Sequence, residues 1–258
     1  TLDADVLVKN IQFLKIQKKE AKHIYLAGSM LYIDRPCTQH EAGARWDGIN
    51  YKPIPVKPLL ELNHPEDVLK NETEALIIEL GVNFNSVLKV IKYKTSIISA
   101  CVSSHYHLDH SKYIPNALKL GIDVYTSSGT INHLKLKPHH CLKKIETMET
   151  IKAGNFKIMA FDTVHNIDGS QGYIISHPEI GKLLFLTDSS AIPYKFSGIN
   201  HFLVEANFDE DKLMENVELG KIHSSLAERI KNDHLSIKAC SDLILANDLT
   251  VCKNIILC

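Results

Sequence analysis

Residues 103–110 read SSHYHLDH and place three histidines and an aspartate within six positions. They come directly after the apolar run TSIISACV, which has the composition of a buried strand. Imidazole and carboxylate groups together are the ligands that zinc, manganese and iron take in proteins. This segment constrains the fold more than any other, because side chains that share an ion have to be held by a rigid element. We interpret it as part of a metal site.

The spacing within the segment supports this interpretation. His105 and His107 lie two positions apart, and alternate side chains of a strand point to the same side. Asp109 and His110 follow where the chain turns toward the helix-like SKYIPNALKLG, so they can reach a second ion. The sequence therefore predicts ligands for two metals. The alternative interpretation is a histidine-rich polar loop at the end of a strand.

The composition is that of a soluble globular protein and excludes the disordered and fibrous classes. The chain has 258 residues and a formal net charge of −1, which argues against a surface that is basic overall; a local basic patch stays open. No apolar run approaches the roughly 20 residues that span a bilayer, and Thr1 does not open a signal peptide. Six cysteines lack paired spacing, which favours reduced core thiols. We expect a cytoplasmic protein with no membrane partner.

Strands and helices alternate over most of the chain. Apolar runs predict strands within residues 74–81, 95–104, 122–127, 171–190, 201–208 and 253–258. Helical patterns cover residues 85–93, 209–220, 224–233 and 236–248, the last two opening with serines suited to capping. Residues 1–70 differ, because they open with a Lys-rich amphipathic stretch and continue with Pro and Gly punctuation. We expect an α/β fold that follows a loop-rich N-terminal segment.

Two metals need more ligands than one segment provides. His165 ends the run FKIMAFDTVH and Asp188 ends KLLFLTD, each at the carboxyl end of an apolar strand, where α/β architectures place their chemistry. Alone, His165 would be read as a hydrogen-bonded edge histidine and Asp188 as a turn or cap residue. Beside the upstream segment both become candidate ligands. Glu205 and Asn207 follow another apolar strand and are either close to the site or part of a helix start.

Together HYHLDH, then TVHN, then LTDSS resemble the metallo-β-lactamase fold superfamily, whose hallmark is HxHxDH followed by a distant His and Asp. VEANFDEDKL and NDHLS resemble more narrowly the YycJ-like bacterial and phage hydrolases, near the RNase Z and RNase J nucleases. The resemblance covers about residues 72–258. It implies an αββα sandwich of two mixed sheets flanked by helices, with residues 71–258 as the hydrolase domain and 1–70 as an N-terminal extension of unclear role.

The resemblance also implies a ligand set and two divalent ions, with zinc as the expected metal and manganese as the alternative. Asp188 would bridge the ions. The first metal would take His105, His107 and His165, and the second would take Asp109 and His110. The catalytic residues would be Asp109, which orients the hydroxide, and His234, which works on the substrate or in proton transfer. A core or cap histidine is the alternative role for His234.

This chain departs from the subgroup at three places. The subgroup has a final histidine after its last apolar strand, where the printed sequence ends at Cys258. Either that ligand lies beyond the printed sequence or another residue takes its place, and for the chain as printed we expect the second metal to be bound more weakly than the first. Asn166 stands where the subgroup commonly has an acid, and the usual Gly/Ser-rich opening is not recognisable in residues 1–70.

The remaining histidines are interpreted without a metal. His133, His139 and His140 lie on a polar, Lys-bearing stretch and are predicted to be surface residues, with the alternative that they line the approach of the substrate. His40 and His64, with Cys37, match no compact zinc spacing.

The resulting hypothesis is a binuclear metal-dependent hydrolase, most simply a phosphodiesterase or nuclease-like enzyme whose substrate is a nucleic acid or nucleotide. Candidate phosphate contacts are Lys112, Lys119, Lys135, Lys137, Lys143 and Lys144. One alternative is a thioester, lactone or amide hydrolase of the same fold. The other is a catalytically weakened binding protein that keeps the fold. A homodimer is left open.

Overall fold

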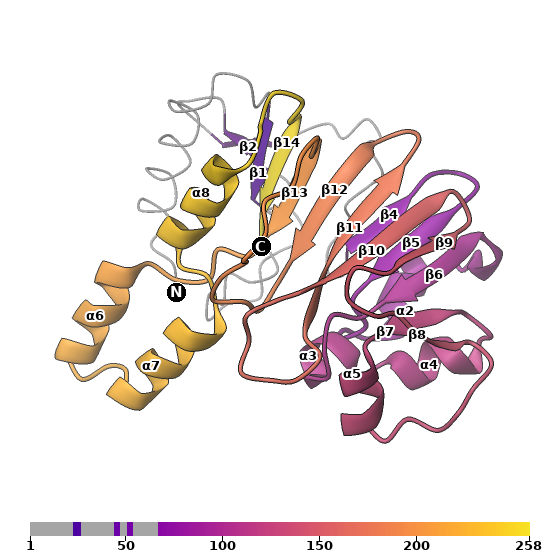
Figure 1. Ribbon diagram of the computed structural model, residues 1–258, viewed down its shortest axis with the longest axis horizontal. Helices are drawn as coiled ribbons and strands as arrows, with labels where there is room; N and C mark the ends of the chain where they lie inside the picture. The colour runs from indigo at the N-terminus through magenta and orange to yellow at the C-terminus, as the bar shows by residue number, and fades with distance from the viewer. Residues whose placement is uncertain (1–22, 27–43, 47–50, 54–66) are drawn as a thin grey trace. The chain divides into compact units, whose positions relative to one another are not determined.

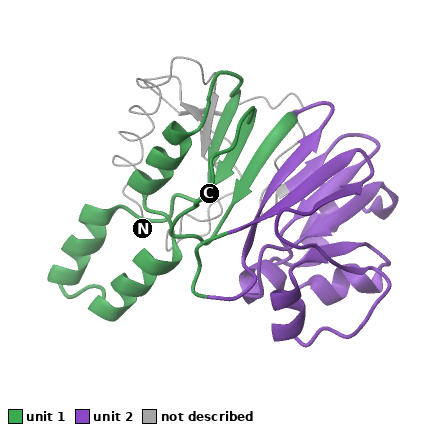
Figure 2. Ribbon diagram, in the orientation of Figure 1, with its two compact units in different colours: residues 1–54, 163–166, 181–258 green, residues 55–162, 167–180 purple. Residues whose placement is uncertain are grey.

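The computed structural model of the chain describes residues 67–258 and the backbone of three short strands at 23–26, 44–46 and 51–53 (Figure 1). The interpretation of His40, His64 and Cys37, and most of the expected N-terminal extension, lie outside the described residues. The chain divides into two compact units (Figure 2). Unit 2 comprises residues 55–162 and 167–180, and unit 1 comprises residues 1–54, 163–166 and 181–258.

Unit 2 contains a five-stranded mixed sheet in the order β4-β5-β6-β7-β8. Strand β4 is antiparallel to β5, and the other neighbours are parallel, with helical segments in their connections. The elements are β4 Asp67–Lys70, β5 Ala75–Ile78, α2 Phe84–Val90, η1 Thr95–Ile97, β6 Ile98–Val102, α3 Leu108–Ser111, α4 Ile114–Lys119, β7 Val124–Thr126, α5 Ser128–His133 and β8 Leu142–Lys144.

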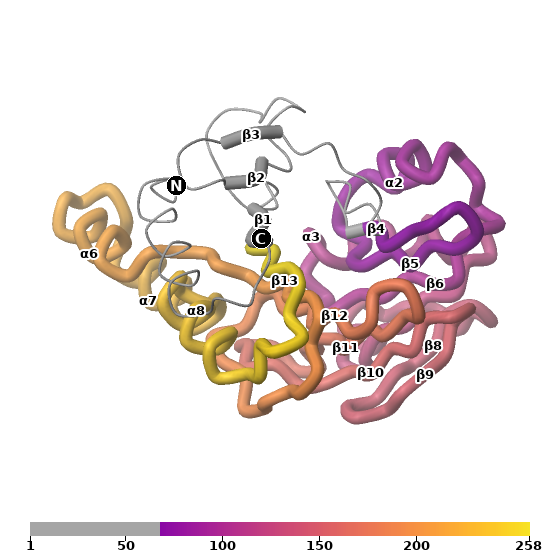
Figure 3. Tube along the Cα trace, turned by 90° about the horizontal axis from the view of Figure 1, so that it is seen from above, coloured from indigo at the N-terminus to yellow at the C-terminus, as the bar shows by residue number. Residues whose placement is uncertain are grey.

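A second layer of unit 2 is an antiparallel meander of β9 Thr150–Ala153, β10 Phe156–Asp162 and β11 Gln171–His177. Figure 3 shows α2 on one side of β5 and β6, and β10 and β11 on the other. The Tyr173 hydroxyl on β11 donates to the Ser103 carbonyl at the end of β6, at 2.8 Å. This buried bond fixes the end of β6 against the meander.

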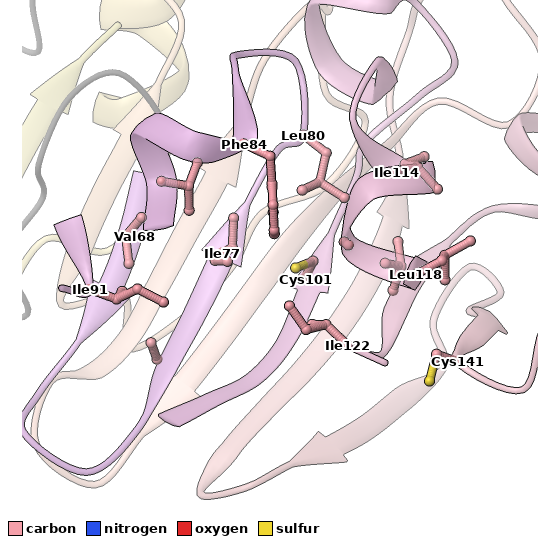
Figure 4. Packing of buried hydrophobic residues seen from close by; sticks show 14 residues of the cluster. Val68, Ile77, Leu80, Phe84, Ile91, Cys101, Ile114, Leu118, Ile122 and Cys141 are labelled. Atoms are coloured by element: carbon pink, nitrogen blue, oxygen red, sulfur yellow. The ribbon is translucent and has the colours of Figure 1, made fainter. Parts of the chain in front are cut away.

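The core of unit 2 lies between the five-stranded sheet and its helices (Figure 4). Phe84 from α2 and Ile114 from α4 pack with Ile77 of β5 and Cys101 of β6. Each fully buried apolar side chain of this kind contributes about 1.5–3 kcal/mol. Ile77 and Cys101 face this core. The neighbouring residues of β5 and β6 are apolar as well, because both faces of a parallel sheet are covered, and the two strands therefore read as apolar runs.

Unit 1 contains strands in the order β3-β2-β1-β14-β13-β12 and three helices near the C-terminus. Strands β12, β13, β14 and β1 are parallel, whereas β2 and β3 pair in antiparallel fashion. The elements are β1 His23–Leu26, β2 Ala44–Trp46, β3 Tyr51–Pro53, β12 Gly181–Leu186, β13 His201–Val204, α6 Glu210–Glu218, α7 Ser224–Asp233, α8 Ile237–Ala246 and β14 Asn254–Leu257.

The expected α/β class is confirmed, since the strands form two mixed sheets flanked by helices. Two local expectations are wrong. Strand β6 ends at Val102, so His105 and His107 lie in the loop beyond the strand and not in it. Helix α7 is capped by the His223 side chain, which accepts from the Ser225 N–H, whereas Ser236 caps α8 as expected. No helix among the described residues combines the length and apolar character of a membrane span.

Parallel register places the polar residues of each unit together. In unit 2, Ile78 at the end of β5 pairs with Val102 at the end of β6, so the residues that follow both strands meet. In unit 1, Leu186 at the end of β12 pairs with Val204 at the end of β13. The carboxyl ends of parallel strands therefore gather the candidate ligands in each unit.

At the opposite end of β5, Glu74 holds the two layers of unit 2 together. Its buried carboxylate accepts from the backbone and side-chain N–H groups of Asn155 at 2.9 and 2.8 Å, and from His177 Nε2 at 2.9 Å. Burial works to raise the pKa of Glu74, but these hydrogen bonds outweigh it and lower the pKa from 4.5. A lowered carboxyl pKa stabilises the fold above the unfolded pKa and loses that effect as pH falls through the folded value.

We predict that Glu74→Gln lowers the free energy of unfolding at pH 7 by about 1–3 kcal/mol, because it leaves buried donors without their charged acceptor. The gap between wild type and variant should narrow as pH falls through the lowered pKa of the folded state, where the wild-type carboxylate protonates. Urea unfolding at several pH values measures both. Glu72→Gln, an exposed change two residues away, is the control. Equal losses in the two variants would contradict the role of Glu74.

Candidate metal centre

Serine hydroxyls hold the HYHLDH segment, which comprises part of the loop after β6 and most of the short helix α3. Ser103 Oγ donates to the His110 carbonyl at 2.9 Å. Ser111 Oγ lies 2.9 Å from both the Tyr106 and the His107 carbonyl oxygens. The loop therefore has its hydrogen bonds supplied locally, which fixes the direction of its side chains.

The loop after β5 passes directly against this segment. The Leu80 N–H donates to the His110 carbonyl at 2.8 Å, and the Tyr113 N–H donates to the Leu80 carbonyl at 2.7 Å. A Cβ on Gly81 would lie 1.5 Å from the Asp109 carbonyl oxygen. Only glycine fits at this position without moving the backbone that carries Asp109 and His110.

The loop brings three imidazoles of unit 2 together. His105 Nε2 lies 3.0 Å from His107 Nδ1, and the rings of His105 and His110 have centroids 4.3 Å apart. His105 and His110 are buried, whereas the Asp109 side chain is 76% exposed and lies 3.6 Å from His110 Nε2. The expected clustering of the segment is present, although a loop and not strand alternation produces it.

Two neighbours orient these histidines. Ser104 Oγ lies 2.8 Å from His105 Nδ1, and a carboxylate oxygen of Glu79 lies 3.4 Å from His110 Nδ1. Glu79 also accepts from the Ser104 N–H, at 3.2 Å, and has a left-handed backbone with φ 71°. Sequence reasoning missed Glu79. The signal was an acid placed directly after the apolar strand β5.

In unit 1, His165 and Asp188 offer ligand atoms within 4.8 Å of one another. The His165 side chain is buried, and its Nδ1 lies 3.8 Å from a carboxylate oxygen of Asp233. Asn166 Nδ2 donates to the other Asp233 oxygen at 3.0 Å. Asp233 of α7 thus places a carboxylate beside His165, although Asn166 stands where the subgroup commonly has an acid. Sequence reasoning missed Asp233, because no local pattern links positions so far apart.

Asp188 lies two residues beyond β12, is 4% exposed and has φ 41°. Aspartate tolerates this left-handed backbone better than branched residues do. The following Ser189 N–H donates to a Glu205 oxygen at 3.4 Å. The turn therefore directs Asp188 toward the end of β13.

Asp188, Glu205 and His234 form a second group in unit 1 whose ligand atoms lie within 4.8 Å of one another. His234 Nδ1 lies 2.5 Å from Glu205 Oε1 and 3.5 Å from Asp188 Oδ1. Glu205 is fully buried and also accepts from Asn207 Nδ2 at 3.0 Å. Of the two interpretations of Glu205, the structure favours a place near the candidate ligand Asp188, because both carboxylates contact His234. The start of helix α6 is capped by Asp209 instead.

The charges in this group are interdependent. Burial raises the pKa of Glu205, and the His234 imidazole opposes that rise. Burial works to lower the pKa of His234, but the carboxylates of Asp188 and Glu205 outweigh it and raise the pKa to about 10. A protonated His234 at neutral pH follows, with Nδ1 occupied by Glu205. His234 also ends helix α7, so it serves as a cap residue in addition.

A further group, His139, His140 and Cys141, also has ligand atoms within 4.8 Å of one another. Its chemistry is less suited to a metal. His139 Nδ1 accepts from the Cys141 N–H at 3.2 Å, and burial together with Asp123 raises the pKa of the Cys141 thiol. A thiolate, the form that binds metals, is therefore disfavoured. His140 is exposed, as expected.

The donor sets in the two units fit divalent metal ions. Neutral imidazoles next to a buried carboxylate are the usual ligands of zinc and also suit manganese or iron. Unit 2 brings together His105, His107, Asp109 and His110, and unit 1 brings together His165 and Asp188.

We predict that Glu205→Gln lowers the pKa of His234 by at least about one unit in metal-free protein, because it removes the nearer of two carboxylates that stabilise the imidazolium. An NMR titration of the His234 ring protons measures this. Glu218→Gln on the exposed face of α6 is the control. A His234 pKa that stays at about 10 in Glu205→Gln would contradict the assigned cause.

No protein-family model matches this chain, and no curated protein matches it significantly. Solved structures do. The metallo-β-lactamase fold protein YhfI from Bacillus subtilis is 16% identical with a TM-score of 0.49, over 75% of this chain and 88% of that one. Human tRNase Z, short form, is also 16% identical with a TM-score of 0.49, over 74% of this chain and 85% of that one.

A mutant of the HARLDQ-motif metallo-β-lactamase from Cronobacter sakazakii is 15% identical with a TM-score of 0.43, over 70% of this chain and 90% of that one. At these scores the matches say nothing about residue roles or substrates. By their names, YhfI is a metallo-β-lactamase fold protein and the Cronobacter sakazakii protein is a metallo-β-lactamase.

Proposed function

We propose that this chain is a metal-dependent hydrolase that cleaves phosphodiesters with a hydroxide held by two divalent ions. The observation that carries the proposal is the packing of His105 and His107, in the loop after β6, with His110 of α3; His105 Nε2 lies 3.0 Å from His107 Nδ1. Burying imidazoles side by side is costly unless they share a ligand or a hydrogen-bond network. The proposed hydrolase domain is residues 71–258.

The proposed ligand set follows the sequence motif. His105, His107 and His165 hold the first ion, Asp109 and His110 hold the second, and Asp188 is shared. Zinc is the proposed metal because imidazoles dominate the first set, and manganese is the alternative because carboxylates contribute to the second. The assignment of ligands from both units to the same ions rests on the sequence motif alone. The cytoplasmic location stays a prediction.

When bound, such ions lower the pKa of a water to about 7 and polarise the phosphoryl oxygens. The chain's own residues do the rest. The exposed Asp109 carboxylate accepts a proton from the attacking water and orients it. Asp188 balances positive charge, and Glu205 keeps Nδ1 of His234 occupied, which leaves the Nε2–H to donate a proton to the leaving oxygen. The contacts of His234 with Glu205 and Asp188 support its protonated form.

A first test is metal content. We predict that His105→Ala lowers the metal bound per chain by about one ion after reconstitution with zinc, because two imidazoles and one carboxylate hold zinc far less well than a complete set. Elemental analysis measures it. His223→Gln, a change at an exposed histidine on α7, is the control. Unaltered metal content in His105→Ala would remove this residue from the ligand set.

A second test is turnover. We predict that Asp109→Asn cuts hydrolysis of bis-p-nitrophenyl phosphate by about two to four orders of magnitude, the usual effect of a positioned proton-transfer group. The melting temperature should change little, because the Asp109 side chain is exposed. Asp211→Asn on α6 is the matched control. Wild-type turnover in Asp109→Asn would exclude it from the mechanism.

The same assay separates the alternatives. A metal-loaded protein that hydrolyses thioester, lactone or lactam probes in preference to the phosphodiester belongs to the other hydrolase class. A metal-loaded protein that hydrolyses none of these probes is the binding protein that keeps the fold.

A further inference from the structure

The segment after helix α5 alternates between core and solvent. Leu134 and Leu136 pack against the hydrophobic core of unit 2, whereas Lys135 and Lys137 between and after them are exposed. The two leucines thus hold the turn that ends α5 against the core, and Lys135, which has a left-handed backbone with φ 51°, and Lys137 are both exposed. This arrangement is a built feature of the fold, because the anchoring side chains belong to the core.

The lysines of this segment are available for a ligand. Among the described residues no carboxylate forms an ion pair with Lys135 or Lys137. Lys144, further along the same face, differs because its Nζ lies 2.7 Å from Glu146. Two exposed positive charges on one short surface segment suit contacts with the phosphates of a nucleic-acid strand.

A flat aromatic pair stands at the start of the segment. The rings of Tyr106 and His133 are stacked, with centroids 3.5 Å apart and planes 5° from parallel. Tyr106 belongs to the HYHLDH loop and its ring meets that of His107 edge-on, with centroids 5.3 Å apart. His133 ends α5 and is exposed. An imidazole backed by a tyrosine and open to solvent is a ready surface for another flat ring.

We propose that His133, Tyr106, Lys135 and Lys137 bind single-stranded nucleic acid, with a base stacked on His133 and phosphates on the two lysines. This inference rests on the proposed function, since it names the substrate class of the same loop. Base-on-aromatic stacking combined with a basic track is how proteins bind single strands without reading their sequence. A duplex is disfavoured, because its bases already stack on each other and the chain's net charge is only −1.

The test is fluorescence anisotropy with a short fluorescein-labelled oligothymidylate. The full, metal-loaded chain carries Asp109→Asn in every sample, so that cleavage does not consume the ligand. In this background His133→Ala is expected to bind roughly five- to tenfold more weakly, whereas His133→Phe keeps a stacking ring and is expected to bind within about twofold of the parent. The two variants together separate stacking from a general loss of structure.

The lysines are tested by salt dependence. Replacing Lys135 and Lys137 by Gln is expected to reduce the slope of log K against log salt by about 1.4, which corresponds to two lost phosphate contacts on a single strand. The matched control replaces Lys152 and Lys157 by Gln, an exposed pair that faces each other across β9 and β10. The control is expected to leave affinity and slope unchanged.

Three results would overturn the inference: parent-like affinity in His133→Ala, an equal slope change in the two lysine pairs, or tighter binding of the matching duplex than of the single strand. None of them bears on the metal ligands. Conversely, an enzyme that fails to hydrolyse any phosphodiester probe but still shows the expected anisotropy changes would refute the proposed function and leave this binding surface standing.

Discussion

The chemistry of this protein depends on the burial of imidazoles at the carboxyl ends of parallel strands. Polar rings removed from water destabilise a fold unless each nitrogen is supplied with a partner. In unit 2 the Ser104 hydroxyl faces His105, and the Glu79 carboxylate faces His110. Gly81 allows the two loops that carry these partners to touch. Close backbone packing at Gly81 therefore helps to orient the histidines, as expected of a metal centre.

Unit 1 follows the same physical rule with carboxylates. Asp188 and Glu205 follow adjacent parallel strands, and two carboxylates this close repel each other unless a cation lies between or beside them. The protonated His234 is one such cation, which is why its pKa is raised to about 10. A divalent ion would be another. The protonated His234 thus balances part of the negative charge of Asp188 and Glu205. A further carboxylate, that of Asp233, lies 3.8 Å from His165 Nδ1.

Much of this could be predicted from the sequence. Ligand types and spacing in HYHLDH indicated a metal site, and apolar runs located β5, β6, β12 and β13. Other features depend on tertiary register. Glu79 contacts the HYHLDH segment only because Ile78 pairs with Val102. The left-handed backbone of Glu79 could not be predicted either, because a single glutamate in the sequence does not indicate it. The contacts of Asp233 with Asn166 and of Tyr106 with His133 join positions far apart in sequence, which periodicity cannot reveal.

The central proposal is that the ligands named from the sequence motif hold two ions side by side. X-ray absorption spectroscopy of the fully zinc-loaded protein tests it most directly, because a neighbouring metal scatters strongly at short range. We predict a metal–metal distance of about 3.5–4 Å, the spacing of two-metal hydrolytic sites, together with imidazole scattering from the histidines. Two bound zinc ions with imidazole scattering but no metal neighbour would show that the ions are held far apart, and would contradict the proposal.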